Sequence, residues 1–221
     1  MSLYRIDLHV HSPASHCFSG DKSSAPLIIE RAKEMRLDMI AVTDHHSASG
    51  IREVQRAAKN AAVTVLPGME LTCRIRDIAE VFLLALFSED FPIESMERQL
   101  RSWQVPPEEF GNGGFVVPVP AEQIIFDVRS SGGLIVSARS DKTEYRRKVI
   151  PDLLRMGVKL FDLVYPRQFP QELFQVSVKE GPLWFFAFSD SHSPAQVGSR
   201  SSEITLSAPV FKSNIKYLAD F

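Results

Sequence analysis

The sequence is poor in cysteine, close to neutral in charge and free of long apolar runs. Its 221 residues include two cysteines, Cys17 and Cys73, which are expected to stay reduced because no secretion signal opens the chain. The 25 basic and 27 acidic residues leave a net charge of −2, which gives no electrostatic grip on nucleic acid or an anionic membrane. No apolar stretch is long enough to cross a bilayer. These absences predict a cytoplasmic protein that neither enters a membrane nor forms a stable nucleic-acid complex.

The chain does contain an alternation of strand-like and helix-like segments. Hydrophobic residues make up 44% of it, and its length fits a single α/β domain over residues 1–221. The apolar patterns predict strands at 5–9, 38–43, 63–66, 80–87, 133–138, 160–164 and 183–188. They predict helices at 26–35, 51–62, 92–103, 120–130, 144–156 and 171–178, and a proline- and glycine-rich loop at 105–120. Such alternation is typical of a mostly parallel sheet.

All six histidines lie in three short blocks, each of which follows an apolar run. The blocks read DLHVHSPASHC, IAVTDHHSASG and FFAFSDSHSP. In the first block, His9 and His11 are two residues apart in a predicted strand, so both side chains point to the same face and could hold one metal ion. A single partly buried histidine is more often bonded to a backbone carbonyl, but clustering at several strand ends favours a metal site.

Two carboxylates accompany the histidine blocks. Glu70, in the sequence VLPGMEL, follows the predicted strand at 63–66, and Asp190 lies two residues before His192. Imidazole and carboxylate together are the ligands of zinc, manganese and iron sites. Because ligands at the carboxyl ends of several strands converge on the mouth of a barrel, the pattern favours a barrel over an open doubly wound sheet.

With these motifs in this order, the sequence resembles the PHP (polymerase and histidinol phosphatase) domain, a family of metal-dependent phosphoesterases. The matching motifs are His9-x-His11, Thr43-Asp44-His45, Pro67-Gly68-Met69-Glu70 and Ser189-Asp190-Ser191-His192. The resemblance runs from Asp7 to about Gly198. It implies an α/β fold, a distorted seven-stranded (β/α)7 barrel like that of triosephosphate isomerase.

The resemblance also implies how the candidate ligands are divided. His9, His11, Glu70 and Asp190 correspond to the ligands of a first metal. His45 and His192 correspond to ligands of the family's third metal, completed by either His16 or Cys17, and a Cys17 thiolate would favour zinc there. Asp44 is expected to bond a ligating imidazole rather than to bind metal itself.

The family's second metal is where the sequence departs from the pattern. Two positions at which members place histidines are occupied here by Phe82 and Arg139, and neither side chain can ligate a metal. A conventional second metal is therefore not expected, and one or two divalent ions (zinc, manganese or iron) are predicted per chain. Arg139 could instead hold a substrate phosphate, or it could pair with Glu70 or a neighbouring carboxylate.

Three functions follow from these residues. The favoured one is a phosphoesterase in which metal-activated water attacks a phosphorylated small molecule or nucleotide, with Arg139 and Asp44 as supporting catalytic residues. The second is a protein that has lost turnover but still binds metal and a phosphorylated ligand. The third, a module of a replicative polymerase, is least favoured because the net charge is near neutral. His46 is expected to be an exposed turn residue, and Cys73 a small apolar filler.

Overall fold

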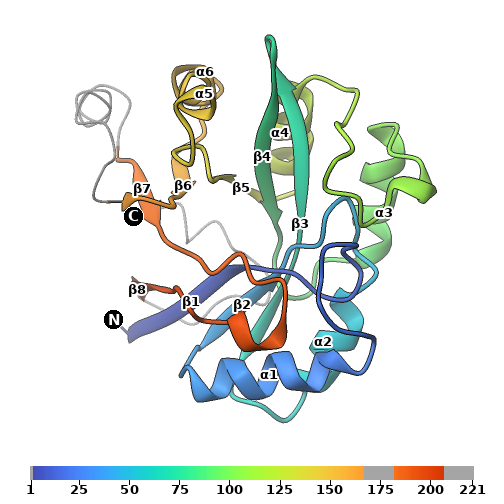
Figure 1. Cartoon of the computed structure of the whole chain (residues 1–221), viewed down its shortest axis with the longest axis vertical. Coiled ribbons are helices and arrows are strands. Elements are labelled where there is room, and N and C mark those ends of the chain that lie inside the picture. The colour runs from blue at the N-terminus through green and yellow to red at the C-terminus, as the bar shows by residue number, and fades with distance from the viewer. Residues whose placement is uncertain (1, 167–181, 207–221) are drawn as a thin grey trace.

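In the computed structural model, which describes residues 2–166 and 182–206, eight strands form one curved sheet in the order β7-β6-β5-β4-β3-β2-β1-β8. The sheet curls until its edge strands β7 and β8 lie on the same side of the molecule (Figure 1). One apolar cluster takes residues from all eight strands, namely Ile6, Met39, Leu66, Leu84, Val136, Leu160, Phe186 and Ile204 with their neighbours. A single interior shared by every strand is the mark of a barrel, here nearly closed.

The first half of the chain follows the expected repeat of strand and helix. Its elements are β1 (Ser2–Val10), α1 (Ser24–Glu34), β2 (Met39–Val42), α2 (Ile51–Ala58) and β3 (Thr64–Ile75). The three strands pair in parallel, and α1 and α2 pack side by side below them in Figure 1. The buried residues Ile28, Ile29, Ile51 and Val54 of these helices join a second apolar cluster outside the barrel. The inner and outer clusters give the two layers of an α/β fold.

The repeat breaks after β3, and this corrects the expected (β/α)7 pattern. β3 continues well past the predicted end at residue 66, and β4 (Ile78–Leu86) returns antiparallel to it through a tight turn at Arg76 and Asp77. The two strands stay paired from Gly68↔Leu86 to Ile75↔Ile78, so apolar residues beyond the metal-ligand motif extend the sheet. No helix separates these strands, and the barrel gains an antiparallel hairpin.

The second half supplies the remaining strands. Its elements are α3 (Ile93–Ser102), η1 (Pro107–Glu109), α4 (Ala121–Ser130), β5 (Leu134–Ala138), α5 (Glu144–Arg147), α6 (Ile150–Arg155), β6 (Leu160–Asp162), β7 (Trp184–Phe186), η3 (Pro194–Gln196) and β8 (Ser202–Leu206). β5, β6 and β7 run parallel to one another. The helix predicted at 144–156 is two helices, because Pro151 stands in the first turn of α6, where its missing N–H removes no helical hydrogen bond.

The strand β8 is the other difference from the prediction of seven strands. It pairs antiparallel with β1, from Ser2↔Leu206 to Ile6↔Ser202, and thereby raises the count to eight. The helix predicted at 171–178 lies outside the described residues. Within the described part of the chain, no helix has the length and apolarity needed to cross a membrane.

Candidate metal centre

The carboxyl ends of β1 and β7 meet the middle of β3 and bring four predicted ligands together. The donor atoms of His9, His11, Glu70 and Asp190 all lie within 4.8 Å of one another. His9 Nε2 lies 3.4 Å from Glu70 Oε1 and 3.2 Å from Asp190 Oδ1, and His11 Nε2 lies 3.4 Å from Glu70 Oε2 and from Asp190 Oδ1. Two imidazoles and two carboxylates therefore face one point.

These four residues fit a divalent ion. The Nε2 atoms of His9 and His11 are buried and have no hydrogen-bond partner, although buried polar atoms are normally paired. Both atoms point at the carboxylates of Glu70 and Asp190. A donor set of nitrogen and oxygen atoms without internal partners is what a zinc, manganese or iron ion would satisfy.

A second group of possible ligands lies beside the first. The donors of His11, Cys17, His45 and His192 also lie within 4.8 Å of one another. The sequence left His16 and Cys17 as alternatives, and the structure brings Cys17 into the group. His16 is exposed, and its backbone N–H donates to Gly111 O.

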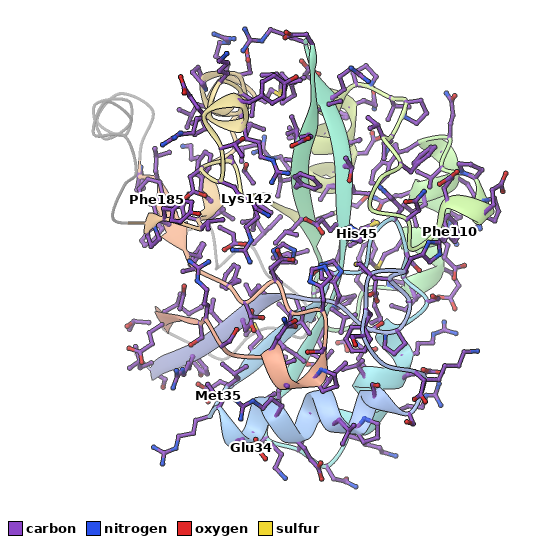
Figure 2. All side chains as sticks on the ribbon, in the orientation of Figure 1. Glu34, Met35, His45, Phe110, Lys142 and Phe185 are labelled. Carbon is purple, nitrogen blue, oxygen red and sulfur yellow. The ribbon has the colours of Figure 1, made fainter. Side chains whose placement is uncertain are left out.

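The two groups share an edge. His11 belongs to both, its ring stacks on that of His192 with centroids 4.4 Å apart, and Glu70 Oε2 lies 3.0 Å from His45 Nδ1. The His45 Nδ1 atom is likewise buried without a hydrogen-bond partner. Figure 2 shows His45 near the middle of the molecule, beside the lower part of the β3–β4 hairpin. Glu70 thus stands between two neighbouring sites.

Asp162 supports His9 from behind, and the sequence analysis missed it. This fully buried side chain at the end of β6 has Oδ2 3.0 Å from His9 Nδ1, while its Oδ1 accepts a hydrogen bond from Phe188 N. A carboxylate on the second ring nitrogen fixes the tautomer that leaves Nε2 free for a metal. The available signal was an aspartate at the carboxyl end of a predicted strand, which is where the ligands also lie.

Asp44 supports His11, but through an intermediate side chain. Ser15 Oγ lies 3.0 Å from His11 Nδ1 and donates to Asp44 Oδ1 at 2.7 Å. Ser12 donates to Asp44 through both its N–H and its hydroxyl. Asp44 therefore makes no direct hydrogen bond to a ligating imidazole. It orients Ser15, which in turn accepts from His11 Nδ1.

Asp7 fixes the segment that carries Asp190 and His192. Its carboxylate accepts hydrogen bonds from Ser189 N, Ser189 Oγ and Gly198 N. Burial raises the pKa of Asp7 to about 6, against the opposing effect of these hydrogen bonds. β1, which carries His9, therefore also anchors through Asp7 the loop that carries Asp190 and His192.

The charges in the first group are strongly coupled. Burial would lower the pKa of His9, but the carboxylates of Asp190 and Glu70 and the bond to Asp162 raise it well above its usual value. Burial would raise the pKa of Glu70 and of Asp190, yet the His9 charge and the adjacent His11 imidazole hold the pKa of both below its usual value. Without a metal, the site is a compact set of imidazolium and carboxylate charges. A metal ion that binds to the imidazole nitrogens displaces their protons.

A loop between α3 and α4 covers the second group. Gly111 N donates to His45 O, and Thr72 Oγ1 donates to Gly113 O. A Cβ atom on Gly113 would lie 2.7 Å from His45 Nε2, so the loop backbone lies directly on the imidazole. The irregular stretch predicted at 105–120 is therefore the wall of the site.

Two expectations about side residues have different outcomes. The prediction that His46 is an exposed turn residue is wrong: it is buried, its Nε2 lies 3.0 Å from Phe115 O, and burial together with the charge of His45 lowers its pKa to about 4. Cys73 is buried as expected, and burial raises the pKa of its thiol.

Comparison with known proteins agrees with this site. The family model of the PHP domain matches residues 7–104. The match spans β1 to α3 and includes His9, His11, Asp44, His45 and Glu70, whereas Asp162, Asp190 and His192 lie beyond it. No curated protein sequence matches the chain.

Solved structures resemble the whole chain. An amidohydrolase from Chromobacterium violaceum, described with bound sulfate and no metal, is 16% identical with a TM-score of 0.68 over 97% of this chain and 96% of its own. A proposed metal-dependent phosphoesterase from Bifidobacterium adolescentis is 16% identical with a TM-score of 0.58 over 97% and 94%. Endonuclease Q, bound to a 27-mer duplex with an abasic lesion, is 14% identical with a TM-score of 0.67, over 98% of this chain and 55% of its own. At these identities the likeness shows that the PHP fold extends beyond residue 104.

Of the two substituted positions, Arg139 lies next to the metal centre. Arg139 follows β5 and is 7% exposed, with its Nε 3.3 Å from Asp190 Oδ2 and 3.6 Å from Asp162 Oδ2. Of the two roles considered for Arg139, the geometry is that of a pair with neighbouring carboxylates, although Glu70 is not among them. Phe82 faces Ala138 across β4 and β5, and the Arg146 guanidinium lies 4.5 Å above its ring.

Two further arginines, Arg76 and Arg200, have partners outside the metal centre. Arg76 pairs with Asp152, and Arg200 Nη2 donates to the carbonyls of Leu163 and Val164. These contacts assign both arginines to holding backbone segments together.

Proposed function

We propose that this protein is a metal-dependent phosphoesterase that holds two divalent ions at the mouth of its barrel. The observation that carries the proposal is the set of buried nitrogen atoms on His9, His11 and His45 that have no hydrogen-bond partner and face carboxylates. The first ion would be held by His9, His11, Glu70 and Asp190. The second would be held by Cys17, His45 and His192, with His11 beside them.

A bound divalent ion supplies a water that ionises near neutral pH and a charge that offsets the phosphoryl oxygens. The protein's own residues orient the ligands. Asp162 holds the proton of His9 on Nδ1, and Ser15, itself held by Asp44, does the same for His11. Glu70 is placed to join the two sites because its oxygens face His9 on one side and His45 on the other.

The two sites differ in the metal they favour. Cys17 adds a soft thiolate to the second donor set, and thiolate with imidazole selects zinc over manganese or magnesium. The first donor set, with two carboxylates, suits manganese or iron as well. We therefore propose zinc at the second site and zinc, manganese or iron at the first.

The proposed substrate is a phosphorylated small molecule or nucleotide. The net charge of −2 supports this choice, because proteins that grip long nucleic acids present an excess of positive charge. A neighbour of the same fold was solved with duplex DNA, so oligonucleotides belong in the substrate panel.

The test is phosphate release from a panel of phosphomonoesters, nucleotides and short oligonucleotides. Chelator-treated protein should be inactive, and addition of zinc or manganese should restore turnover. Glu70→Gln should abolish turnover because it removes the charge between the two sites. The surface variant Glu94→Gln, whose carboxylate pairs with Arg52 away from the site, serves as the control and should match wild type.

A second function is favoured by Arg139 and Phe82, which occupy the positions where the PHP family places histidine ligands of a further metal. On this alternative the protein binds metal and a phosphorylated ligand without turning it over. Metal-loaded protein that binds inorganic phosphate yet hydrolyses no member of the panel would establish it.

A further inference from the structure

We propose that Arg139 is a positioning residue that sets the coordination of both metal sites by clamping the segment 188–192. The proposal rests on the function proposed above, because it concerns the same ligands. Arg139 itself binds no metal. Its guanidinium fixes the side chain that completes the first site and the backbone that supports the second.

The first part of the clamp acts on the Asp190 carboxylate. Oδ1 of Asp190 faces the imidazoles of His9 and His11, at 3.2 Å and 3.4 Å from their Nε2 atoms, whereas Oδ2 lies 3.3 Å from Arg139 Nε. The guanidinium charge therefore lies beside one carboxylate oxygen, as an ion pair and not a hydrogen bond, and the other oxygen faces the metal site. Asp190 is held as a ligand through one oxygen.

Asp190 needs such a clamp because packing does not hold it. Its side chain is 25% exposed, whereas those of His9 and His11 are fully buried and that of Glu70 is 5% exposed. A partly exposed carboxylate without a cation beside it can turn toward water or present both oxygens to a metal. Among the described residues, Arg139 is the arginine that pairs with Asp190, whose other cationic neighbours are histidines.

The second part of the clamp acts on the backbone. Arg139 Nη2 donates to Phe188 O at 3.3 Å, and Arg139 N donates to Asp162 O at 2.9 Å. Phe188 N in turn donates to the Asp162 carboxylate. Arg139 thus ties the ends of β5 and β6 to the start of the segment that delivers Asp190.

Backbone conformation supports the same conclusion. Arg139 and Asp190 both have left-handed backbones, with φ of 56° and 54°. Such values are uncommon outside glycine and persist where surrounding contacts hold them. The pair of guanidinium and carboxylate joins two residues whose backbones would otherwise relax.

Asp190 carries the effect to the second site. Its carbonyl oxygen lies 2.8 Å from His192 Nδ1, and Ser191, between them, donates its N–H to His9 O and accepts from His11 N. If Asp190 shifts, the His192 ring shifts with it. Loss of Arg139 should therefore weaken the first site most and the second site less.

Cobalt(II) titration separates these effects, because only the second site contains a thiolate and gives a sulfur-to-cobalt charge-transfer band. The variants are Arg139→Met, which removes the charge, and Arg139→Lys, which keeps it but lacks the fork needed to reach Asp190 and Phe188 O together. Arg200→Met is the matched control, since Arg200 also binds backbone carbonyls but touches no ligand. Circular dichroism of each metal-free variant checks that it is folded.

We expect Arg139→Met to weaken cobalt binding at the first site by about 10–100-fold, the usual effect of removing a partner of a ligand, and to weaken the thiolate band less. Arg139→Lys should fall between Arg139→Met and wild type, and it stands in if Arg139→Met fails to fold. The ligand-field spectrum of the first site should also change as Asp190 gains freedom. Superimposable titrations of wild type and both Arg139 variants, or an equal loss in Arg200→Met, would overturn the inference. Wild-type protein that binds no cobalt would overturn the proposed function as well.

Discussion

Replacing Asp162 with asparagine tests whether the carboxylate behind His9 controls the metal. Oδ1 of Asp162 accepts from Phe188 N, and Oδ2 lies 3.0 Å from His9 Nδ1. Asparagine can keep the first bond with its carbonyl oxygen, which turns its NH2 group toward His9. That donor would require His9 Nδ1 to accept, and the imidazole proton would then lie on Nε2, the atom that faces the first site.

The expected loss follows from this reversal of the tautomer. Partners of ligating histidines are worth about 10–100-fold in metal affinity, or about 1.4–2.8 kcal/mol. Asp162 is fully buried, so water cannot readily replace the missing acceptor, and the loss should lie toward the upper end of that range. The assay is competition for zinc with a chromophoric chelator, with elemental analysis to count the bound ions.

Asp127→Asn is the control for removal of a carboxylate elsewhere. Asp127 accepts from Trp103 Nε1 and from Gln123, outside the metal centre, and its replacement should leave zinc affinity unchanged. If Asp162→Asn binds zinc as tightly as wild type at both sites, the assignment of the Nε2 atom of His9 as a metal donor is refuted.

Four further predictions concern single residues. Iodoacetamide should modify Cys17, which is exposed, and spare Cys73, whose burial raises its thiol pKa; bound zinc should slow the first reaction, and equal labelling with and without zinc would remove Cys17 from the site. Because neighbouring carboxylates keep the pKa of His9 above its usual value, zinc binding near pH 7 should release protons, seen as calorimetric heats that depend on the buffer; heats independent of buffer would contradict this. The pKa of His46 falls from 6.5 to about 4 on folding, so protonation of this one side chain should cost about 3 kcal/mol of unfolding free energy as pH falls from 6.5 to 4; the metal-free His46→Gln variant should lack this contribution, and equal pH dependence of the two proteins would contradict it. Gly113→Ala should weaken the second site by about 10-fold or more, because the added Cβ would lie 2.7 Å from His45 Nε2; an unchanged thiolate band in cobalt-loaded protein would show that the loop yields.

Most of the fold could be predicted from the sequence because most of the chain lies in strands and helices with a regular hydrophobic periodicity. This periodicity predicted the strand β4 but missed the extension of β3 beyond residue 66, the antiparallel pairing of β3 with β4, and β8, all of which depend on tertiary pairing. Leu71, Cys73 and Ile75 did not by themselves predict that β3 would extend and form a hairpin with β4, because antiparallel pairing depends on the partner strand. The five residues of β8 become a strand through β1.

The candidate ligands could be predicted because motifs of histidine and carboxylate at strand ends have a definite chemistry. Their supports could not, since Asp162 and Ser15 are ordinary residues whose role depends on what folding brings within 3 Å. The burial of His46 was missed for a similar reason: Phe115, which holds it, comes from a loop about 70 residues away. Distance in the sequence hid the contacts of Asp162 and Phe115, whereas Ser15 lies only four residues from His11 and its role depends on how the turn after β1 folds.

The two groups of ligands are proposed to form one metal-dependent phosphoesterase site. The most direct measurement is phosphate release by chelator-treated protein reloaded with zinc or manganese, with bound metal counted in the same samples. We expect two ions per chain and turnover that appears only when they are bound. Two bound ions without hydrolysis of any phosphomonoester, nucleotide or oligonucleotide would contradict the catalytic claim, and no bound ions would contradict the metal centre itself.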